Sequence, residues 1–441
     1  MENKTIRIGS GAGYGGDRIE PALDLLSQAN LDYIIFECLA ERTIALANQE
    51  KKINPNKGYN PLSLYRFEMI LDQYKQKPFN TKIITNMGAA NPIALAQEVK
   101  QMIHDRGLNL KVAAIIGDDI FDLLDLNLNT IETKEPLSLY KNQLISANAY
   151  IGINGVVEAL KQGADIIIGG RLADPSLALA PLVYEFGWKM DDYDYLARGT
   201  CAGHLLECAA QVCGGYFYDG VYKEVPNLEN LGFPYADISS TGDIIISKLE
   251  SSGGIVNEMT VKEQLLYEIM DPSNYFTPDV IMDISKAYIK EIGHNRVQVS
   301  NVYGKAQNEY YKVSCGITDG YMVESEISYG GHHCTVRAQK AIDILSYRLC
   351  DLDSPIQYDL IGLNSLYKTP IERTNLKEVR VRVACKTNSN DEAQRIANEV
   401  EALYTNGPAG GGGVRKHIQP IVSILSVLVN RDILKEEVII L

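Results

Sequence analysis

Short apolar runs alternate with longer segments of helical periodicity along the first half of the chain. The runs are rich in β-branched residues, which is typical of buried strands. We predict strands over 5–8, 32–36, 82–85, 111–116 and 165–168. Helices are predicted over 17–28, 40–51, 62–76, 92–106, 155–161, 175–186 and 203–212. This alternation indicates a mostly parallel sheet flanked by helices on both faces, as an open Rossmann-like layering or as a barrel.

The pattern changes near residue 285, where longer strands of alternating polarity begin. We predict strands over 296–302, 310–316, 321–328, 378–384 and 421–429, an extended segment at 356–363, and helices over 335–350 and 391–404. Strands and helices grouped in this way favour an α+β domain on a mostly antiparallel sheet. We therefore predict an α/β domain over 1–285 and an α+β domain over 286–441, with the boundary inside 272–292.

Composition argues against some classes of binding partner and of cellular location. The 441 residues are 46% hydrophobic and carry a net charge of −14, which argues against nucleic acid because phosphate binding depends on clustered Lys and Arg. No run of about 18 apolar residues is present, and the first residues lack the apolar core of a signal peptide. The eight cysteines include no C-x-x-C pair, which favours reduced thiols. We expect a cytoplasmic homo-oligomer without membrane or nucleic-acid partners.

Glycine is concentrated directly after the first predicted strand. The glycines are Gly9, Gly11, Gly13, Gly15 and Gly16, and Asp17 follows them. Such a loop lets backbone N–H groups approach a ligand, and the next helix N-terminus favours phosphate or carboxylate. Gly11, Gly13 and Gly16 also fit G-x-G-x-x-G, with Glu37 ending the second strand, which is a dinucleotide-binding layout. The loop therefore predicts an anion site, with nicotinamide or flavin binding as the alternative.

Polar residues follow the other predicted strands as well. Ligands of parallel sheets and barrels bind beyond the carboxyl ends of the strands. The residues at these ends are Glu37, Glu41, Arg42, Asn86, Asn91, Asp118, Asp119, Arg171 and Asp174. Arg171 can grip a carboxylate or phosphate through two hydrogen bonds, or can pair with Asp174. Helix capping by Asn91, Asp118 or Asp174 is the structural alternative.

Further candidates lie on a helix and at two glycine-rich junctions. His204 and Glu207 share a helix face, so His204 is expected to move protons or to serve as a surface or capping residue. His332 and His333 are adjacent and point apart, which disfavours a shared metal. The glycine run 407–413 is either an anion cradle or a flexible connection.

Five ordered segments carry a family resemblance. They are GSGAGYGGDR at 9–18, FECLAE at 36–41, GGRLADP at 169–175, GTCAGHLLEC at 199–208 and GPAGGGG at 407–413. With them the chain resembles the acyclic terpene utilisation, AtuA-like family over nearly its whole length. The resemblance implies the degradation of branched acyclic terpenoids and their acyl-CoA intermediates. It implies no particular reaction or catalytic residue, and one fold commonly serves many substrates.

These observations together predict an enzyme that acts on a small anionic carboxylate or acyl-CoA by hydration, isomerisation or lyase chemistry. Proton transfer is assigned to Glu37, Asp118 and His204. Substrate binding is assigned to Gly11, Gly13, Gly15, Gly16, Asp17, Asn86, Arg171 and Asp174. The cofactor is unknown. A CoA thioester as substrate is preferred over NAD as cofactor and over Mg²⁺ held by Glu37, Asp118, Asp119 and Asp174. No resident metal is predicted.

Three alternatives belong to other classes. An NAD(P)-dependent oxidoreductase would use the glycine loop, with Glu37 on the ribose. A non-catalytic subunit or binding protein of a catabolic complex would place the polar strand ends at an interface. A metal-dependent hydrolase would hold a tightly bound ion.

Overall fold

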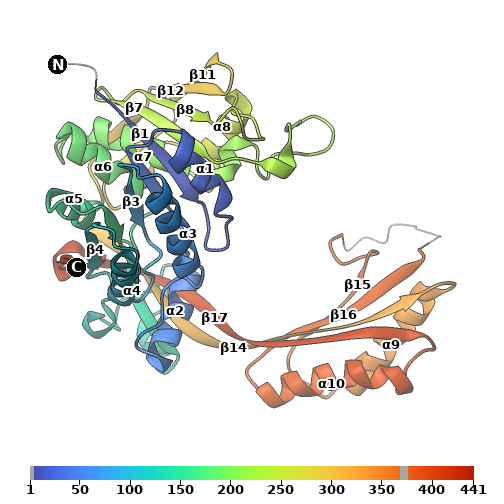
Figure 1. Ribbon diagram of the computed structural model, residues 1–441. Helices are drawn as coiled ribbons and strands as arrows, with labels where there is room; N and C mark the ends of the chain where they lie inside the picture. The colour runs from blue at the N-terminus through green and yellow to red at the C-terminus, as the bar shows by residue number, and fades with distance from the viewer. Residues whose placement is uncertain (1–3, 368–375) are drawn as a thin grey trace. The chain divides into compact units, whose positions relative to one another are not determined.

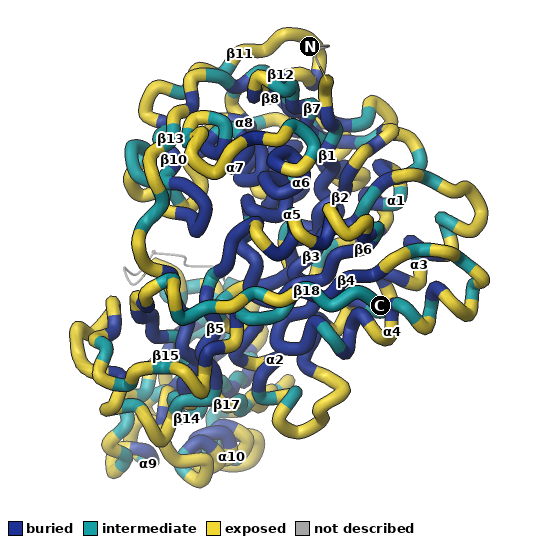
Figure 2. Tube along the Cα trace, turned by 90° about the vertical axis from the view of Figure 1, so that its left-hand side faces the viewer, coloured by how far each residue is buried: buried dark blue, intermediate teal, exposed yellow. Residues whose placement is uncertain are grey.

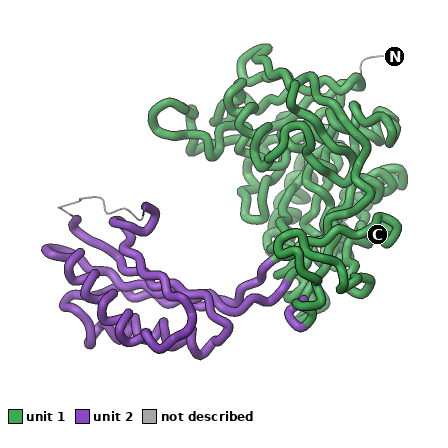
Figure 3. Tube along the Cα trace, turned by 180° about the vertical axis from the view of Figure 1, so that it is seen from behind, with its two compact units in different colours: residues 1–141, 145–316, 424–441 green, residues 142–144, 317–423 purple. Residues whose placement is uncertain are grey.

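The computed structural model describes residues 4–367 and 376–441, and its contacts divide the chain into two compact units (Figure 3). The first comprises residues 1–141, 145–316 and 424–441, and the second comprises residues 142–144 and 317–423. The predicted boundary at 285/286 does not coincide with this division. Strands β11 (Tyr288–Gly293) and β12 (Arg296–Ser300) pair into the sheet of the first unit, and the C-terminal strand returns to the same sheet.

The first unit contains, within the described residues, a ten-stranded sheet in the order β11-β12-β8-β7-β1-β2-β3-β6-β4-β18. Its five central strands run parallel, as the alternation predicts. They are β1 (Thr5–Ala12), β2 (Tyr33–Phe36), β3 (Lys82–Thr85), β6 (Ile166–Ile168) and β4 (Val112–Ile116). The expectation of a mostly parallel sheet needs correction, because β7 (Pro234–Ser239), β8 (Ile244–Lys248), β11, β12 and β18 (Glu437–Ile440) join antiparallel. Short turns link β7 to β8 and β11 to β12, whereas residues 249–287, which include α8 (Glu258–Leu266), connect β8 to β11.

Helices cover both faces of the parallel centre, which explains its continuous apolar strands. Ile34 and Phe36 of β2 face one core, whereas Ile35 between them is buried on the opposite face. The first core also contains residues of α1 (Glu20–Gln28), α3 (Ser63–Gln76) and α4 (Pro92–Asp105). The opposite face carries α5 (Asn154–Lys161), α6 (Ser176–Phe186) and α7 (Tyr193–Glu207). The labelled central strands β2, β3 and β6 are accordingly dark blue in Figure 2.

Two helix starts bear on the candidate residues. Asn91 caps α4 by accepting from the Ala94 N–H, with Pro92 at the first helical position, as predicted. At α6 the N-cap is Pro175 and no side chain caps the helix, so Asp174 is not a capping residue. Helix α7 begins at Tyr193, ten residues before the predicted start at 203. His204 therefore lies in its last turn.

Strand β1 continues through the first part of the predicted glycine loop. Gly9 and Gly11 are strand residues, and a Cβ on them would lie 2.5 Å from atoms of Leu31 and Phe36, respectively. These glycines allow neighbouring side chains to pack closely against the strand. The expectation of a loop over 9–16 is therefore wrong for 9–12, and the loop contains only residues from Gly13 onward.

The second unit has the element order βαββαβ (Figure 1). Its elements are β14 (Tyr310–Gly330), α9 (Cys334–Arg348), β15 (Ile356–Ile361), β16 (Glu378–Thr387), α10 (Asn390–Asn406) and β17 (Gly411–Asn430). The strand order β15-β16-β14-β17, with β14 and β15 antiparallel to β16, is that of a ferredoxin-like fold. The predicted α+β character of this region is confirmed.

The glycine run 407–413 belongs to the second unit and is partly a strand. Gly411, Gly412 and Gly413 begin β17. The Arg337 guanidinium donates to the Ala409 carbonyl at 2.6 Å and to the Gly330 carbonyl at 2.5 Å. This arginine contacts carbonyl groups of both segments, and residues 411–413 of the run are part of the sheet.

Within the two described ranges, no helix is both long and apolar enough to cross a bilayer.

Candidate active site

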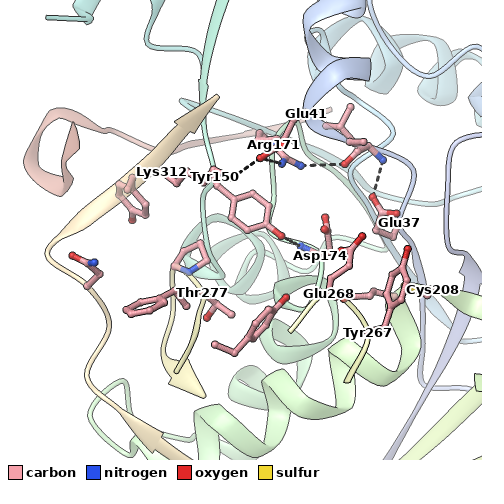
Figure 4. Close-up of a pocket in the computed structure, with 18 of the residues that line it drawn as sticks. Glu37, Glu41, Tyr150, Arg171, Asp174, Cys208, Tyr267, Glu268, Thr277 and Lys312 are labelled. Carbon is pink, nitrogen blue, oxygen red and sulfur yellow. Dashed lines mark hydrogen bonds and ion pairs between the residues drawn. The ribbon is translucent and has the colours of Figure 1, made fainter. Parts of the chain in front are cut away.

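A pocket of about 730 Å³ lies in the first unit, at the carboxyl edge of the parallel strands (Figure 4). Its lining includes residues that follow β1, β2 and β6, the end of α7, and the segments 267–278 and 308–312. The members used below are Gly13, Tyr14, Glu37, Leu39, Glu41, Tyr150, Arg171, Asp174, Glu207, Cys208, Tyr267, Glu268, Tyr275, Phe276, Tyr310 and Lys312. The predicted convergence of strand-end side chains is present in this pocket for Glu37, Arg171 and Asp174.

Arg171 is the buried cation of the pocket, with 5% of its surface exposed. Its Nη1 donates to the Leu39 carbonyl at 3.1 Å, and its guanidinium carbon lies 4.5 Å from the centre of the Tyr150 ring. These contacts hold the planar group in one orientation. Within residues 4–367 and 376–441, its Nε has no hydrogen-bond partner.

Glu41 lies between two cations at one side of the pocket. Its Oε1 is 3.7 Å from Nη2 of Arg171 and 2.7 Å from Nζ of Lys312 (Figure 4). Burial raises the pKa of Glu41, but the hydrogen bond and charge of Lys312 outweigh it and lower the pKa overall. Glu41 is therefore ionised, and the group of three keeps one net positive charge.

Glu37 follows β2 and is held by its neighbours. Its Oε1 accepts from the Leu39 N–H at 2.8 Å and from Nδ2 of Asn86 at 3.2 Å. Burial, followed by the charge of Asp174, raises the pKa of Glu37 well above its ordinary value. Asn86 is buried behind Glu37 and does not line the pocket, so it positions this carboxyl group.

Asp174 follows β6, beside Tyr150 (Figure 4). The Asp174 N–H donates to the Tyr150 hydroxyl at 3.0 Å. Burial raises the pKa of Asp174 to about 7; Arg171 opposes this rise and Glu207 adds to it. No partner binds its Oδ1 in the described part of the chain. This carboxyl group can both accept and release a proton near neutral pH.

His204 and Glu207 form a buried pair in the last turn of α7. His204 Nδ1 lies 2.7 Å from Glu207 Oε1, and the His204 ring packs against Tyr275 with 5.3 Å between ring centres. Burial lowers the pKa of His204, but the charge and hydrogen bond of Glu207 outweigh it and raise the pKa overall. Glu207 lines the pocket, whereas His204 lies behind it. The predicted shared helix face is confirmed.

Asp118 does not line the pocket, and its carboxylate accepts hydrogen bonds from groups behind the pocket. Its Oδ2 accepts from the Arg171 N–H at 3.1 Å and from Nδ2 of Asn148 at 3.0 Å. Burial raises the pKa of Asp118 to about 6. The carboxylate also lies so close to Gly170 that a Cβ there would be 2.8 Å from it. Asp118 thus positions the turn that carries Arg171, and direct proton transfer by this residue has no geometric support.

Among the glycine-loop candidates, Gly13 is the one that lines the pocket. Its N–H donates to the Asp17 carboxylate at 2.9 Å, and the Asp17 carbonyl accepts from Nη2 of Arg66 at 2.8 Å. A Cβ on Gly15 would lie 2.7 Å from Asn60 Nδ2 and one on Gly16 would lie 2.8 Å from the Tyr14 ring, and Gly11 lies in β1. The Asp17 carboxylate therefore occupies the Gly13 N–H, which is not free to bind phosphate.

A model of the acyclic terpene utilisation family, described as "Acyclic terpene utilisation family protein AtuA", matches residues 6–440. The chain belongs to this family. Its description suggests that this AtuA family member is involved in acyclic terpene utilisation.

Two further comparisons add little to this assignment. No curated protein matches the chain. One solved structure that matches is the "De novo designed protein Ferredog-Diesel", which is 22% identical and covers 22% of this chain and 85% of the designed chain, with a TM-score of 0.16. At that score the similarity carries no argument about fold or function.

Several pocket residues of this AtuA family member are not predicted by the sequence. Tyr150 follows β5 (Leu144–Ala149), which pairs with β14 and stands outside the ten-stranded sheet. Lys312 lies in β14, and Tyr275 lies in the short strand β9 (Tyr275–Phe276). These segments contain no recognisable motif. Glu207, in contrast, is indicated in the sequence by its spacing from His204 on a helix.

The geometry of the pocket supports neither a metal site nor a reactive thiolate. Across the described residues, no cluster of three or more His, Cys, Asp or Glu side chains is arranged to hold a metal ion. The magnesium alternative with Glu37, Asp118, Asp119 and Asp174 therefore lacks geometric support. Burial, with a contribution from Glu207, raises the pKa of Cys208 strongly, which keeps this pocket cysteine a neutral thiol.

Proposed function

We propose that this AtuA family member is an enzyme that moves protons on a small carboxylate or acyl thioester, in hydration, isomerisation or lyase chemistry. The observation that supports this best is one pocket in which a buried, oriented arginine lies beside carboxyl groups of raised pKa. Arg171 supplies the anchor for a carboxylate or carbonyl oxygen through its unpaired Nε. Glu37 and Asp174 supply groups that carry protons near neutral pH.

The different environments of these two carboxyl groups suggest different roles. Glu37 accepts two hydrogen bonds and still has a pKa well above its ordinary value, so it is the proton donor in this proposal. Asp174, with a pKa of about 7, is half ionised at neutral pH and serves as the base. Besides burial, the charge of Asp174 raises the pKa of Glu37, so loss of a proton from Asp174 favours its retention on Glu37.

The mouth of the pocket suits a hydrocarbon chain. Tyr14, Phe276 and Tyr310 line it, with 62%, 60% and 44% of their surfaces exposed. Exposed aromatic side chains gathered at a pocket are typical of binding sites for apolar groups. The proposed substrate therefore has its acid or thioester end at Arg171 and its chain toward this aromatic rim.

The oxidoreductase alternative receives less support from the geometry. A dinucleotide fold places pyrophosphate on free backbone N–H groups where the strand order reverses. Here the Gly13 N–H is occupied by Asp17, and β1 is flanked on one side by the antiparallel strand β7. Titration with NAD⁺ and NADH, followed by thermal denaturation, tests the alternative; a melting shift would restore it.

Hydrogen exchange tests the proposed chemistry without knowledge of the natural substrate. We would incubate the protein with hexanoyl-CoA and with hexanoate in D₂O and follow deuterium beside the carbonyl by mass spectrometry. We expect enzyme-dependent incorporation, reduced by about 100-fold or more in Glu37→Gln and Asp174→Asn. Glu229→Gln changes an exposed carboxylate outside the pocket and serves as the matched control. Binding without any exchange would favour the binding-protein alternative.

A further inference from the structure

Two buried polar atoms of opposite character are left without a partner at the same pocket. They are Oε2 of Glu207 and Nε of Arg171, and neither has a hydrogen-bond partner in the described parts of the chain. The two side chains are 7% and 5% exposed, and both residues line the pocket. A buried polar group without a partner costs free energy, so native proteins rarely retain one without a reason. A ligand that reaches both atoms would supply the missing partners.

The chemistry that each atom needs can be stated. Arg171 is always a donor, so Nε requires an acceptor on the ligand. Glu207 Oε1 is hydrogen-bonded to His204 Nδ1, and the proton of that bond lies on one partner or the other. Burial lowers the pKa of His204, but Glu207 raises it overall, so the proton lies on His204 and Oε2 of the ionised Glu207 acts as an acceptor. The ligand must therefore present a donor to Glu207.

Neighbouring groups strengthen this requirement for a donor. Asp174 Oδ1, which lacks a partner among the described residues, is a second acceptor at the same pocket. Besides burial, the charge of Glu207 raises the pKa of Asp174, and both residues line the pocket. Behind Glu207, the Gln264 amide donates to the His204 carbonyl at 3.0 Å, which fixes the end of α7. The acceptor side of the pocket is thus built and held in place.

We propose that the ligand of this pocket is a hydroxy acid or hydroxyacyl thioester, with its carboxylate or carbonyl oxygen at Arg171 and its hydroxyl donated to Glu207. This proposal rests on the proposed function, because hydration and its reverse produce or remove a hydroxyl group near the carbonyl. An ammonium group would also donate to Glu207, and the experiment separates it from a hydroxyl.

Matched ligands test the proposal on the unmodified full chain. Dissociation constants would be measured by calorimetry for hexanoate, 2- and 3-hydroxyhexanoate, 3-methoxyhexanoate and 3-aminohexanoate, and for the CoA thioesters of the first three. We expect at least one hydroxy compound to bind about tenfold or more tightly than its deoxy parent, because a hydrogen bond to a charged acceptor has roughly that effect. The methoxy compound, which accepts but does not donate, should bind no better than hexanoate.

Each other outcome has a definite meaning. Equal affinity for hydroxy and deoxy compounds would overturn the hydroxyl assignment and leave the Arg171 anchor of the proposed function intact. Tighter binding of 3-aminohexanoate than of 3-hydroxyhexanoate would replace the hydroxyl by an ammonium group. Failure of every carboxylate and thioester to bind would overturn the proposed function together with this inference.

A variant locates the donor contact. Glu207→Gln should abolish the preference for the hydroxy compound, measured within the variant as the ratio of the dissociation constants of hexanoate and the hydroxy compound. Glu229→Gln, an exposed position outside the pocket, should keep the preference. Retention of the preference in Glu207→Gln would contradict the assignment. A thermal melt of each variant identifies loss of folding, in which case the ligand series on the unmodified chain decides.

Discussion

His204 Nδ1 and Glu207 Oε1 lie 2.7 Å apart at the end of α7, and both side chains are buried. A histidine buried alone would resist protonation, but here the neighbouring carboxylate favours it. The pair links a residue that the sequence singles out, His204, to the residue that lines the pocket, Glu207.

The first prediction concerns the proton on His204. Burial lowers the pKa of this ring and Glu207 raises it by more, so we expect His204 to titrate above the ordinary histidine value of about 6.5. In Glu207→Gln the opposing charge is lost and the pKa should fall below that value. NMR of ring-labelled histidine, assigned through His204→Gln, measures both. An unchanged His204 pKa in Glu207→Gln would contradict the pairing.

The second prediction concerns stability against pH. The folded pKa of Asp174, about 7, exceeds the unfolded value of about 3.9. The folded state therefore binds the extra proton, and its stabilising contribution is full below pH 4 and lost as the pH rises toward 7. Asp174→Asn should remove a slope of at most about 1.4 kcal/mol per pH unit from the free energy of unfolding in that window. Urea denaturation at pH 4, 5, 6 and 7 measures it.

A matched control for that series is Asp122→Asn, which changes an exposed carboxylate. Its pH slope should equal that of the unmodified chain. If Asp174→Asn shows the same slope as Asp122→Asn, the raised pKa of Asp174 is wrong.

The third prediction concerns Gly13, where β1 passes into the loop. A Cβ at this position would lie 2.4 Å from the backbone carbon of Cys208, directly after α7. Because backbone cannot rotate away as a side chain can, we expect Gly13→Ala to lower the free energy of unfolding by about 1–3 kcal/mol. Gly412→Ala has open space around its Cβ and is the control. Equal stability of the two variants in urea would show that this close approach is absent.

The fourth prediction concerns chain length in the proposed substrate. Phe276 lies at the mouth of the pocket and is 60% exposed, so its replacement should cost little stability. We expect Phe276→Ser to weaken binding of octanoate by roughly tenfold and binding of acetate hardly at all, since burial of each CH₂ group contributes about 0.8 kcal/mol. Calorimetry with the two acids measures this difference. The exposed Tyr347, outside the pocket, gives the control Tyr347→Ser. Equal losses for both acids would remove the aromatic rim from the proposed binding mode.

Local pattern alone was sufficient for the parallel centre of the fold. The run 82–85 is β3 itself, and α3, α4 and α6 begin within one residue of their predicted starts. Among the flanking antiparallel strands, β12 lies within the predicted strand 296–302, whereas β7, β8, β11, β18 and the start of α7 were missed. At α7 the helix contains Gly199, a weak helix former, whose small size is needed because Leu179 and Trp188 pack against it. Tertiary packing thus overrides the local preference.

The candidate site likewise has a part that the sequence predicts and a part that only the tertiary structure determines. Hydrophobic periodicity and strand ends, which are properties of neighbouring residues, determined that Glu37, Arg171 and Asp174 would meet at one edge of the sheet. Only the tertiary structure decided that Asn86 and Asp118 turn toward buried backbone and side-chain groups, that Asp17 occupies the Gly13 N–H, and that Tyr150, Lys312 and Glu207 complete the pocket. The physical reason is that burial and hydrogen-bond partners depend on segments far apart in the chain, such as β6 and β14, and no local pattern records which of them come together.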